Sequence, residues 1–144
     1  GAFKDPRHEA LGWRSYENSS INQGIDWKKL RVAYGIPETN IELIRDKTYI
    51  LEAGFEKLNG VDFKKGCYVG QEITARMKHK TTLRKGLIKV SVIGETPVGT
   101  EILADGRPAG VLYSQSDGHG LAFLKLDRAS PKMKAGEAIV IIEN

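Results

Sequence analysis

Apolar and polar positions follow a helical period at two places in the first half of the chain. Apolar side chains three and four positions apart occur at Trp27, Leu30 and Tyr34. The Gly35-Ile36-Pro37 sequence that follows is typical of a helix end. Farther along, residues 71–77 are good helix formers and carry an apolar stripe four residues apart. We therefore expect one helix over residues 25–34 and a second that begins just after residue 70.

After residue 82 the pattern changes to short runs of strand length. These runs occupy residues 86–93, 100–104, 109–114, 121–126 and 138–142. Glycine-containing turns separate some of them, as at Asp105-Gly106, and short strands at such intervals are typical of a small barrel or sandwich. Segment 3–16 receives no assignment, because Pro6 and Gly12 interrupt it. We expect an α+β protein with an α/β segment over residues 1–81 and a small antiparallel β-barrel over residues 82–144.

Composition places the chain among ordinary globular proteins. Hydrophobic residues make up 40% and charged residues 28% of its 144 residues. No apolar run reaches the length of a membrane helix, and the first residues lack the layout of a signal peptide. One cysteine cannot form an internal disulfide, which excludes the disulfide-stapled secreted class. We expect no membrane partner and a cytoplasmic location, or the mitochondrial matrix in a eukaryote.

Basic residues are concentrated between positions 76 and 85, although the net charge is only +4. The run consists of Arg76, Lys78, His79, Lys80, Arg84 and Lys85. One interpretation is a solvated face, which is the usual role of such runs. The other is a patch that binds a phosphate backbone or a polyglutamylated cofactor tail. Nucleic acid is therefore retained as a partner that this patch would bind.

Cys67 is the residue whose side chain is best suited to reactivity or metal binding. It lies between Gly66 and Gly70, just before the second expected helix, and Lys64 and Lys65 precede it. Helix N-termini and neighbouring cations favour the thiolate form of cysteine. The alternative is a buried cysteine that acts as a small hydrophobe. No second cysteine accompanies it, and a metal or cluster site needs about four ligands, so a partner would have to supply the others.

Few other residues point to chemistry. Glu52 lies in the mostly apolar stretch 49–55, so its carboxylate is expected to have a specific partner. We assign the larger aromatic residues to the core, namely Trp13, Tyr16, Trp27, Tyr34 and Tyr49. The chain has no nucleophile elbow, no phosphate-binding loop with Lys-Ser/Thr and no helical metalloprotease motif.

The octapeptide Lys65-Gly66-Cys67-Tyr68-Val69-Gly70-Gln71-Glu72 resembles the defining motif of the YgfZ branch of the glycine-cleavage T-protein superfamily, which includes a mitochondrial iron–sulfur assembly homologue. Further segments follow the order and spacing of that family and extend the resemblance over essentially the whole chain. They are Asp5-Pro6-Arg7, Leu11-Gly12, Arg14, Arg31, Gly35-Ile36-Pro37-Glu38 and Gly110-Val111-Leu112-Tyr113-Ser114.

The resemblance implies a fold, a cofactor and site residues. It implies the C-terminal part of a T-protein-like fold, with an N-terminal portion that completes the folate pocket missing from this chain. It implies tetrahydrofolate as cofactor, Glu52 on the folate side, Cys67 as the functional thiol and the rest of the octapeptide as its support. Partners would be iron–sulfur client enzymes or assembly proteins, together with the missing portion.

Two departures from the family patterns bear on function. The T-protein has an acid and an aromatic residue where this chain has Cys67 and Tyr68, which favours an accessory role over aminomethyl transfer. In contrast, Glu52-Ala53-Gly54-Phe55 is closer to the Glu-Ala-Gly-Leu of the T-protein than to the YgfZ pattern. The leading hypothesis is a folate-binding factor for iron–sulfur cluster assembly or repair. A folate-dependent aminomethyl or one-carbon transferase and a factor linked to tRNA modification remain as alternatives, so enzymatic activity is left open.

Overall fold

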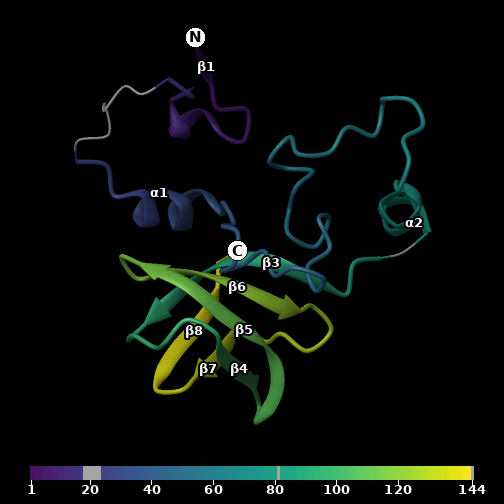
Figure 1. Ribbon diagram of the computed structural model, residues 1–144. Helices are drawn as coiled ribbons and strands as arrows, with labels where there is room; N and C mark the ends of the chain where they lie inside the picture. Colours follow the sequence, from purple (N-terminus) through teal and green to yellow (C-terminus); the bar gives the residue numbers. More distant parts are fainter. Residues whose placement is uncertain (18–23, 81, 144) are drawn as a thin grey trace.

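The computed structural model describes residues 1–17, 24–80 and 82–143. Six antiparallel strands close into a barrel in the order β3-β6-β5-β4-β7-β8 (Figure 1). The strands are β3 (Lys85–Ile93), β4 (Thr100–Ala104), β5 (Arg107–Ser116), β6 (His119–Lys125), β7 (Lys132–Ala135) and β8 (Ala138–Ile142). The expected barrel is confirmed and the alternative of a sandwich is wrong.

The core lies inside the barrel, because alternate side chains of each strand point inward. Its members include Val90, Ile102, Leu112, Leu124, Met133 and Val140, all at most 2% exposed. Small residues permit close approach of the strands: a Cβ at Gly110 would lie 2.3 Å from the carbonyl oxygen of Phe123. Strand β7 was not expected, because its sequence Lys132-Met133-Lys134-Ala135 offers only two apolar side chains.

Segment 3–16 forms a small two-stranded sheet. Strand β1 (Ala2–Lys4) pairs with β2 (Trp13–Ser15), and the short 3₁₀ helix η1 (Glu9–Leu11) lies between them. The buried carboxylate of Asp5 pairs with the guanidinium groups of Arg7 and Arg14 at 2.8 and 3.1 Å. Hydrogen bonds from the Arg7 side chain hold the pKa of Asp5 at about 2, although burial acts in the opposite direction. Asp5 is therefore the ionised centre that ties this segment together.

Helix α1 (Trp27–Tyr34) confirms the first expected helix and packs on the barrel, chiefly on β5 (Figure 1). Asp26 caps its start by accepting a hydrogen bond from the amide of Lys29 at 2.9 Å, and Gly35 ends it in a left-handed conformation with φ of 68°. The buried face differs from the expected one. Arg31 and Val32 are its buried residues.

The expectation that the larger aromatic residues belong to the core is wrong. Trp27 and Tyr34 are each 42% exposed. The others are more exposed still: Tyr49 at 51%, Trp13 at 67% and Tyr16 at 79%. Helix α1 turns an aliphatic and a cationic side chain toward the barrel instead, so helical spacing of aromatic residues did not identify the packed face.

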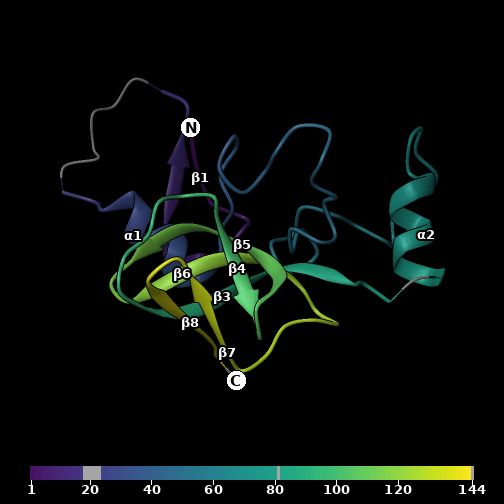
Figure 2. The same ribbon diagram turned by 90° about the horizontal axis from the view of Figure 1, so that it is seen from below.

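Helix α2 (Glu72–Lys80) confirms the second expected helix but has no buried residue. It lies apart from the barrel in both views (Figures 1 and 2). The Lys78 ammonium group joins it to segment 55–63, forming an ion pair with Glu56 and lying 5.1 Å from the centre of the Phe63 ring. Residues 36–71 between the two helices consist mainly of turns. The division of the chain between residues 81 and 82 remains a prediction.

Candidate functional site

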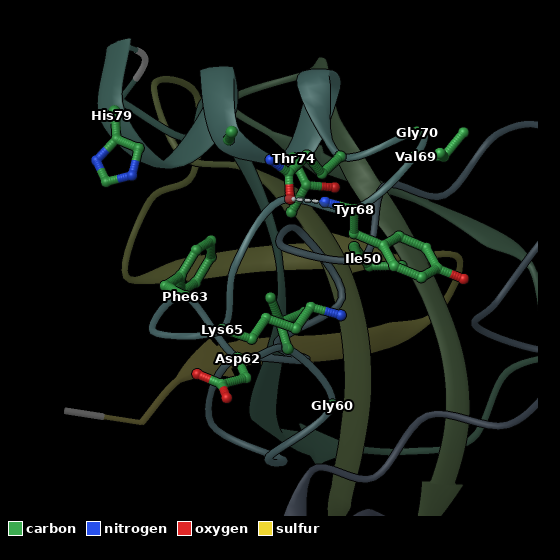
Figure 3. A pocket seen from close by; sticks show the side chains of 13 residues that line it. Ile50, Gly60, Asp62, Phe63, Lys65, Tyr68, Val69, Gly70, Thr74 and His79 are labelled. Atoms are coloured by element: carbon green, nitrogen blue, oxygen red, sulfur yellow. Dashed lines mark hydrogen bonds between the residues drawn. The ribbon is translucent and has the colours of Figure 1, made fainter.

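A hollow of about 390 Å³ separates segment 60–71 from α2 (Figure 3). Residues of the octapeptide form one side of it, and α2 forms the other. Its lining includes Phe63, Lys65, Tyr68, Gln71, Thr74 and His79. The structure therefore gathers Lys65, Tyr68, Gly70 and Gln71 of the expected site around one space.

The octapeptide leads into α2 through a hydrogen-bonded turn. The amide of Tyr68 donates to Oε1 of Gln71 at 2.9 Å, and the amide of Gln71 donates back to the carbonyl oxygen of Tyr68 at 3.3 Å. Gly70 lies between them with φ of 84°, a conformation that side-chain-bearing residues rarely adopt. Glu72 follows in the first turn of α2, where a negative charge favours the helix dipole. Gly70 and Gln71 thus have a structural reason to be present at these positions.

Tyr68 and Lys65 form a cation–aromatic pair at the edge of the hollow. The Lys65 ammonium nitrogen lies 4.5 Å from the centre of the Tyr68 ring, and 67% of Tyr68 is exposed. Such pairs are worth about 0.5–1 kcal/mol at exposed sites. The contact therefore places a positive charge and an accessible ring side by side.

Cys67 is exposed, so its interpretation as a buried small hydrophobe is wrong. It faces a shallow depression beside the hollow, which it shares with Tyr68, Val69, Glu72 and others. Within residues 1–17, 24–80 and 82–143, no three histidine, cysteine or acidic side chains are grouped to hold a metal ion. Cys67 alone can offer one thiolate ligand, and any further ligands would have to approach from outside.

Glu52 lies outside the hollow, although Ile50, two residues earlier, contributes to its lining. Burial raises the pKa of the half-buried Glu52 carboxyl, and the positive charge of Lys85 opposes this effect. The expectation of a specific partner for the Glu52 carboxylate is wrong. In the described part of the chain, no side chain forms a hydrogen bond or ion pair with that carboxylate. The backbone contributes instead, since the Glu52 carbonyl oxygen accepts from the Leu87 amide of β3 at 2.7 Å.

The expected basic run is only partly available to a ligand. The side chain of Lys78 is occupied by Glu56 and Phe63. The remaining positively charged residues of the run are exposed: Arg76, Lys80, Arg84 and Lys85. They continue from α2 to the start of β3.

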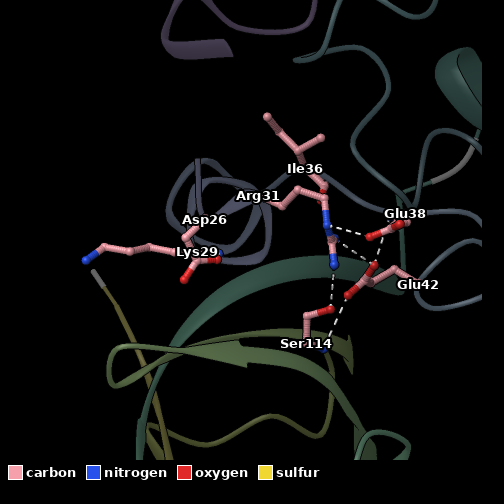
Figure 4. Close-up of polar contacts among 7 residues, drawn as sticks. All are labelled: Asp26, Lys29, Arg31, Ile36, Glu38, Glu42 and Ser114. Atoms are coloured by element: carbon pink, nitrogen blue, oxygen red, sulfur yellow. Dashed lines mark hydrogen bonds and ion pairs between the residues drawn. The ribbon is translucent and has the colours of Figure 1, made fainter. Parts of the chain in front are cut away.

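A buried ionic network that sequence reasoning missed connects segment 31–42 to the barrel (Figure 4). The Arg31 guanidinium donates to Oε2 of Glu42 at 3.2 Å and to the hydroxyl of Ser114 in β5 at 2.9 Å. Glu42 also accepts from the backbone amides of Glu38 and Ser114. The signal was present, because Glu42 lies in Ile41-Glu42-Leu43-Ile44, an apolar setting like that of Glu52.

Residues 84–143 match the family described as "CAF17, C-terminal beta-barrel domain". The barrel is thus similar to the CAF17 C-terminal β-barrel domain. Across a longer stretch the chain is similar to the iron-sulfur cluster assembly factor IBA57, mitochondrial, of Mus musculus, with 34% identity over 140 residues, 85% of this chain and 39% of the relative. The human IBA57 is 34% identical over 137 residues, which cover 85% of this chain and 38% of the relative. An IBA57 homolog of Neurospora crassa is 37% identical over 115 residues, which cover 73% of this chain and 26% of the relative.

These comparisons confirm the expected relationship at a coarse level. The CAF17-type barrel and the IBA57 relatives agree with a partial T-protein-like fold related to iron–sulfur assembly factors, whereas the YgfZ subgroup remains a prediction. The names of the relatives place them in mitochondria, as expected for a eukaryotic protein. The chain spans about two fifths of the length of the mouse and human relatives. No helix in the described residues is long and apolar enough to cross a membrane.

Proposed function

We propose that this chain is part of a mitochondrial iron–sulfur cluster assembly factor in which Cys67 is the functional group. The observation that carries the proposal is the exposed thiol of Cys67, which lies just before a hydrogen-bonded turn and α2. Similarity to factors named for this role over 85% of the chain supports the same function.

The Cys67 thiolate is suited to binding an iron–sulfur cluster that is passed to another protein. Thiolates are the usual ligands of iron–sulfur clusters, which need about four in all. Cys67 supplies one, so the acceptor enzyme or another assembly protein supplies the rest. Lys64 and Lys65 precede the thiol in sequence and are exposed, and their charge attracts the anionic cluster–thiolate complex.

Complementation in cells tests this role. A longer protein that contains this chain, directed to mitochondria, is expected to restore the activity of iron–sulfur enzymes in cells depleted of their own IBA57. A mitochondrial enzyme without a cluster serves as the control and should not respond. Failure to restore activity when the protein accumulates at normal levels would contradict the proposed function.

We further propose tetrahydrofolate as a cofactor, on the basis of the family resemblance. The half-buried Glu52 carboxyl, whose pKa is raised by burial, suits hydrogen bonding to a pterin. When bound, the folate would carry a one-carbon unit.

Calorimetry with tetrahydrofolate under anaerobic conditions measures this binding in the longer protein. Glu52→Gln is expected to weaken this binding at least about tenfold, because one charged hydrogen bond is worth about 1.5–3 kcal/mol. Glu101→Gln, on the exposed side of β4, is the matched control. Equal affinities of the two variants would remove Glu52 from the folate site. Aminomethyl transfer at enzyme rates would instead favour the transferase alternative.

A further inference from the structure

Net positive charge is concentrated in one stretch of the chain. Residues 64–85 contain seven lysine and arginine residues and one acid, Glu72, for a net charge of +6. Since the whole chain has a net charge of +4, the remaining residues together carry −2. A localised patch of this kind attracts polyanions, whereas the modest net charge of the whole chain would not.

The same stretch surrounds accessible aromatic rings. Phe63 and His79 meet edge to face at the hollow, with ring centres 6.3 Å apart and planes at 73°. Tyr68 lines the hollow as well and is 67% exposed. Figure 3 shows these three side chains around the hollow, which is open to solvent. Exposed rings among cations are typical of surfaces on which unpaired bases stack.

Four exposed cations flank the link between α2 and β3 in sequence. Arg76 and Lys80 are four residues apart and so lie on one side of α2. Arg84 directly precedes β3, and Lys85 is its first residue. All four are exposed, whereas Lys78 is held by Glu56 and supports Phe63.

We propose that this surface binds single-stranded nucleic acid. One unpaired base enters the hollow among Phe63, Tyr68 and His79. Arg76, Lys80, Arg84 and Lys85 contact the phosphates on either side. An acidic protein segment would match the charge but would not need the hollow lined with rings, so the observations favour a ligand that has both phosphates and flat bases.

Fluorescence anisotropy with the 144-residue chain tests the proposal. The probes are labelled oligouridylate and oligothymidylate of about 12 nucleotides, within the usual site size. Between about 50 and 200 mM KCl, the logarithm of the affinity should fall against that of the salt with a slope of about −0.7 per phosphate contact, or about −2 to −3 here. Tighter binding of one probe assigns the site to RNA or to DNA.

Two variants separate the contributions of charge and stacking. Arg84→Glu with Lys85→Glu should weaken binding at least about tenfold and flatten the salt slope, while Lys132→Glu with Lys134→Glu on β7 should change it less than about twofold. Phe63→Leu removes a ring but keeps an apolar side chain, and should weaken binding about fivefold or more, since stacking is worth about 1–3 kcal/mol per base.

Three results would overturn the proposal. They are an absence of binding at low salt, unchanged binding by folded Phe63→Leu, and equally tight binding of an oligoglutamate of the same length and charge. The last two would leave a patch that recognises charge alone. Because the readout is direct binding, failure here leaves the role in cluster assembly unaffected, and failure of complementation leaves nucleic-acid binding unaffected.

Discussion

Cys67→Ser is expected to abolish the restoration of iron–sulfur enzyme activity in depleted cells, down to the level without the protein. A serine hydroxyl is a poor ligand for cluster iron at neutral pH, whereas a thiolate is the preferred one. The fold should remain unchanged, because Cys67 is exposed and the substitution replaces one small side chain by another. The free energy of unfolding is therefore expected to stay within about 0.5 kcal/mol of the parent.

Restoration of enzyme activity is expected to require a thiol at position 67, and a thiol elsewhere on the surface should not replace it. The double variant Cys67→Ser with Glu101→Cys moves the thiol to the exposed side of β4 and should fail like the single variant. Enzyme activity is measured in extracts after the level and folding of each variant have been checked. Full activity with a folded Cys67→Ser protein would remove Cys67 from the mechanism.

Glu42→Ala is expected to produce the largest loss of stability, about 3–5 kcal/mol, which is the usual cost of removing one partner of a buried ion pair. The Glu42 side chain is fully enclosed, and that of Arg31 is 3% exposed. Without the Glu42 carboxylate, the buried guanidinium keeps only the half-exposed carboxylate of Glu38, the Ser114 hydroxyl and the Ile36 carbonyl oxygen as partners. The amides of Glu38 and Ser114 would also lose their acceptor.

Urea unfolding of the 144-residue chain measures this effect. Asp46→Ala is the matched control, since the Arg45–Asp46 ion pair is exposed, with 93% and 88% of the two side chains accessible. Exposed pairs contribute about 0–1 kcal/mol, so this variant should stay close to the parent. A loss below about 1 kcal/mol for Glu42→Ala would show that the network does not hold segment 31–42 against β5.

The parts of the fold that depend on local sequence were predictable. Both helices and five of the six barrel strands follow from spacing and turn residues. Strand β7 did not, because Lys132 and Lys134 alternate with its only two apolar residues and its place depends on pairing with distant β4 and β8. The exposed aromatic residues were misplaced for a similar reason, since burial depends on which elements meet.

The site, too, could be predicted only where it depends on local sequence. The octapeptide and the helix after it are continuous in sequence, so the turn at Gly70 could be anticipated. The hollow could not, because it needs Phe63 and His79, which are brought together only when α2 folds back along segment 55–63. Glu42 and Glu52 occupy similar apolar sequences, yet only Glu42 has a buried partner, and no spacing rule separates them.

The closed ring of six barrel strands also limits how this chain can meet another protein. Many domains recruit partners by β-augmentation, in which an incoming strand pairs with a free sheet edge. Every strand of this barrel already has a neighbour on each side, so the barrel offers no such edge. A partner of the barrel must therefore be recognised through side chains and loops, which leaves the turn at Cys67 and the adjoining α2 better suited to exchange between proteins.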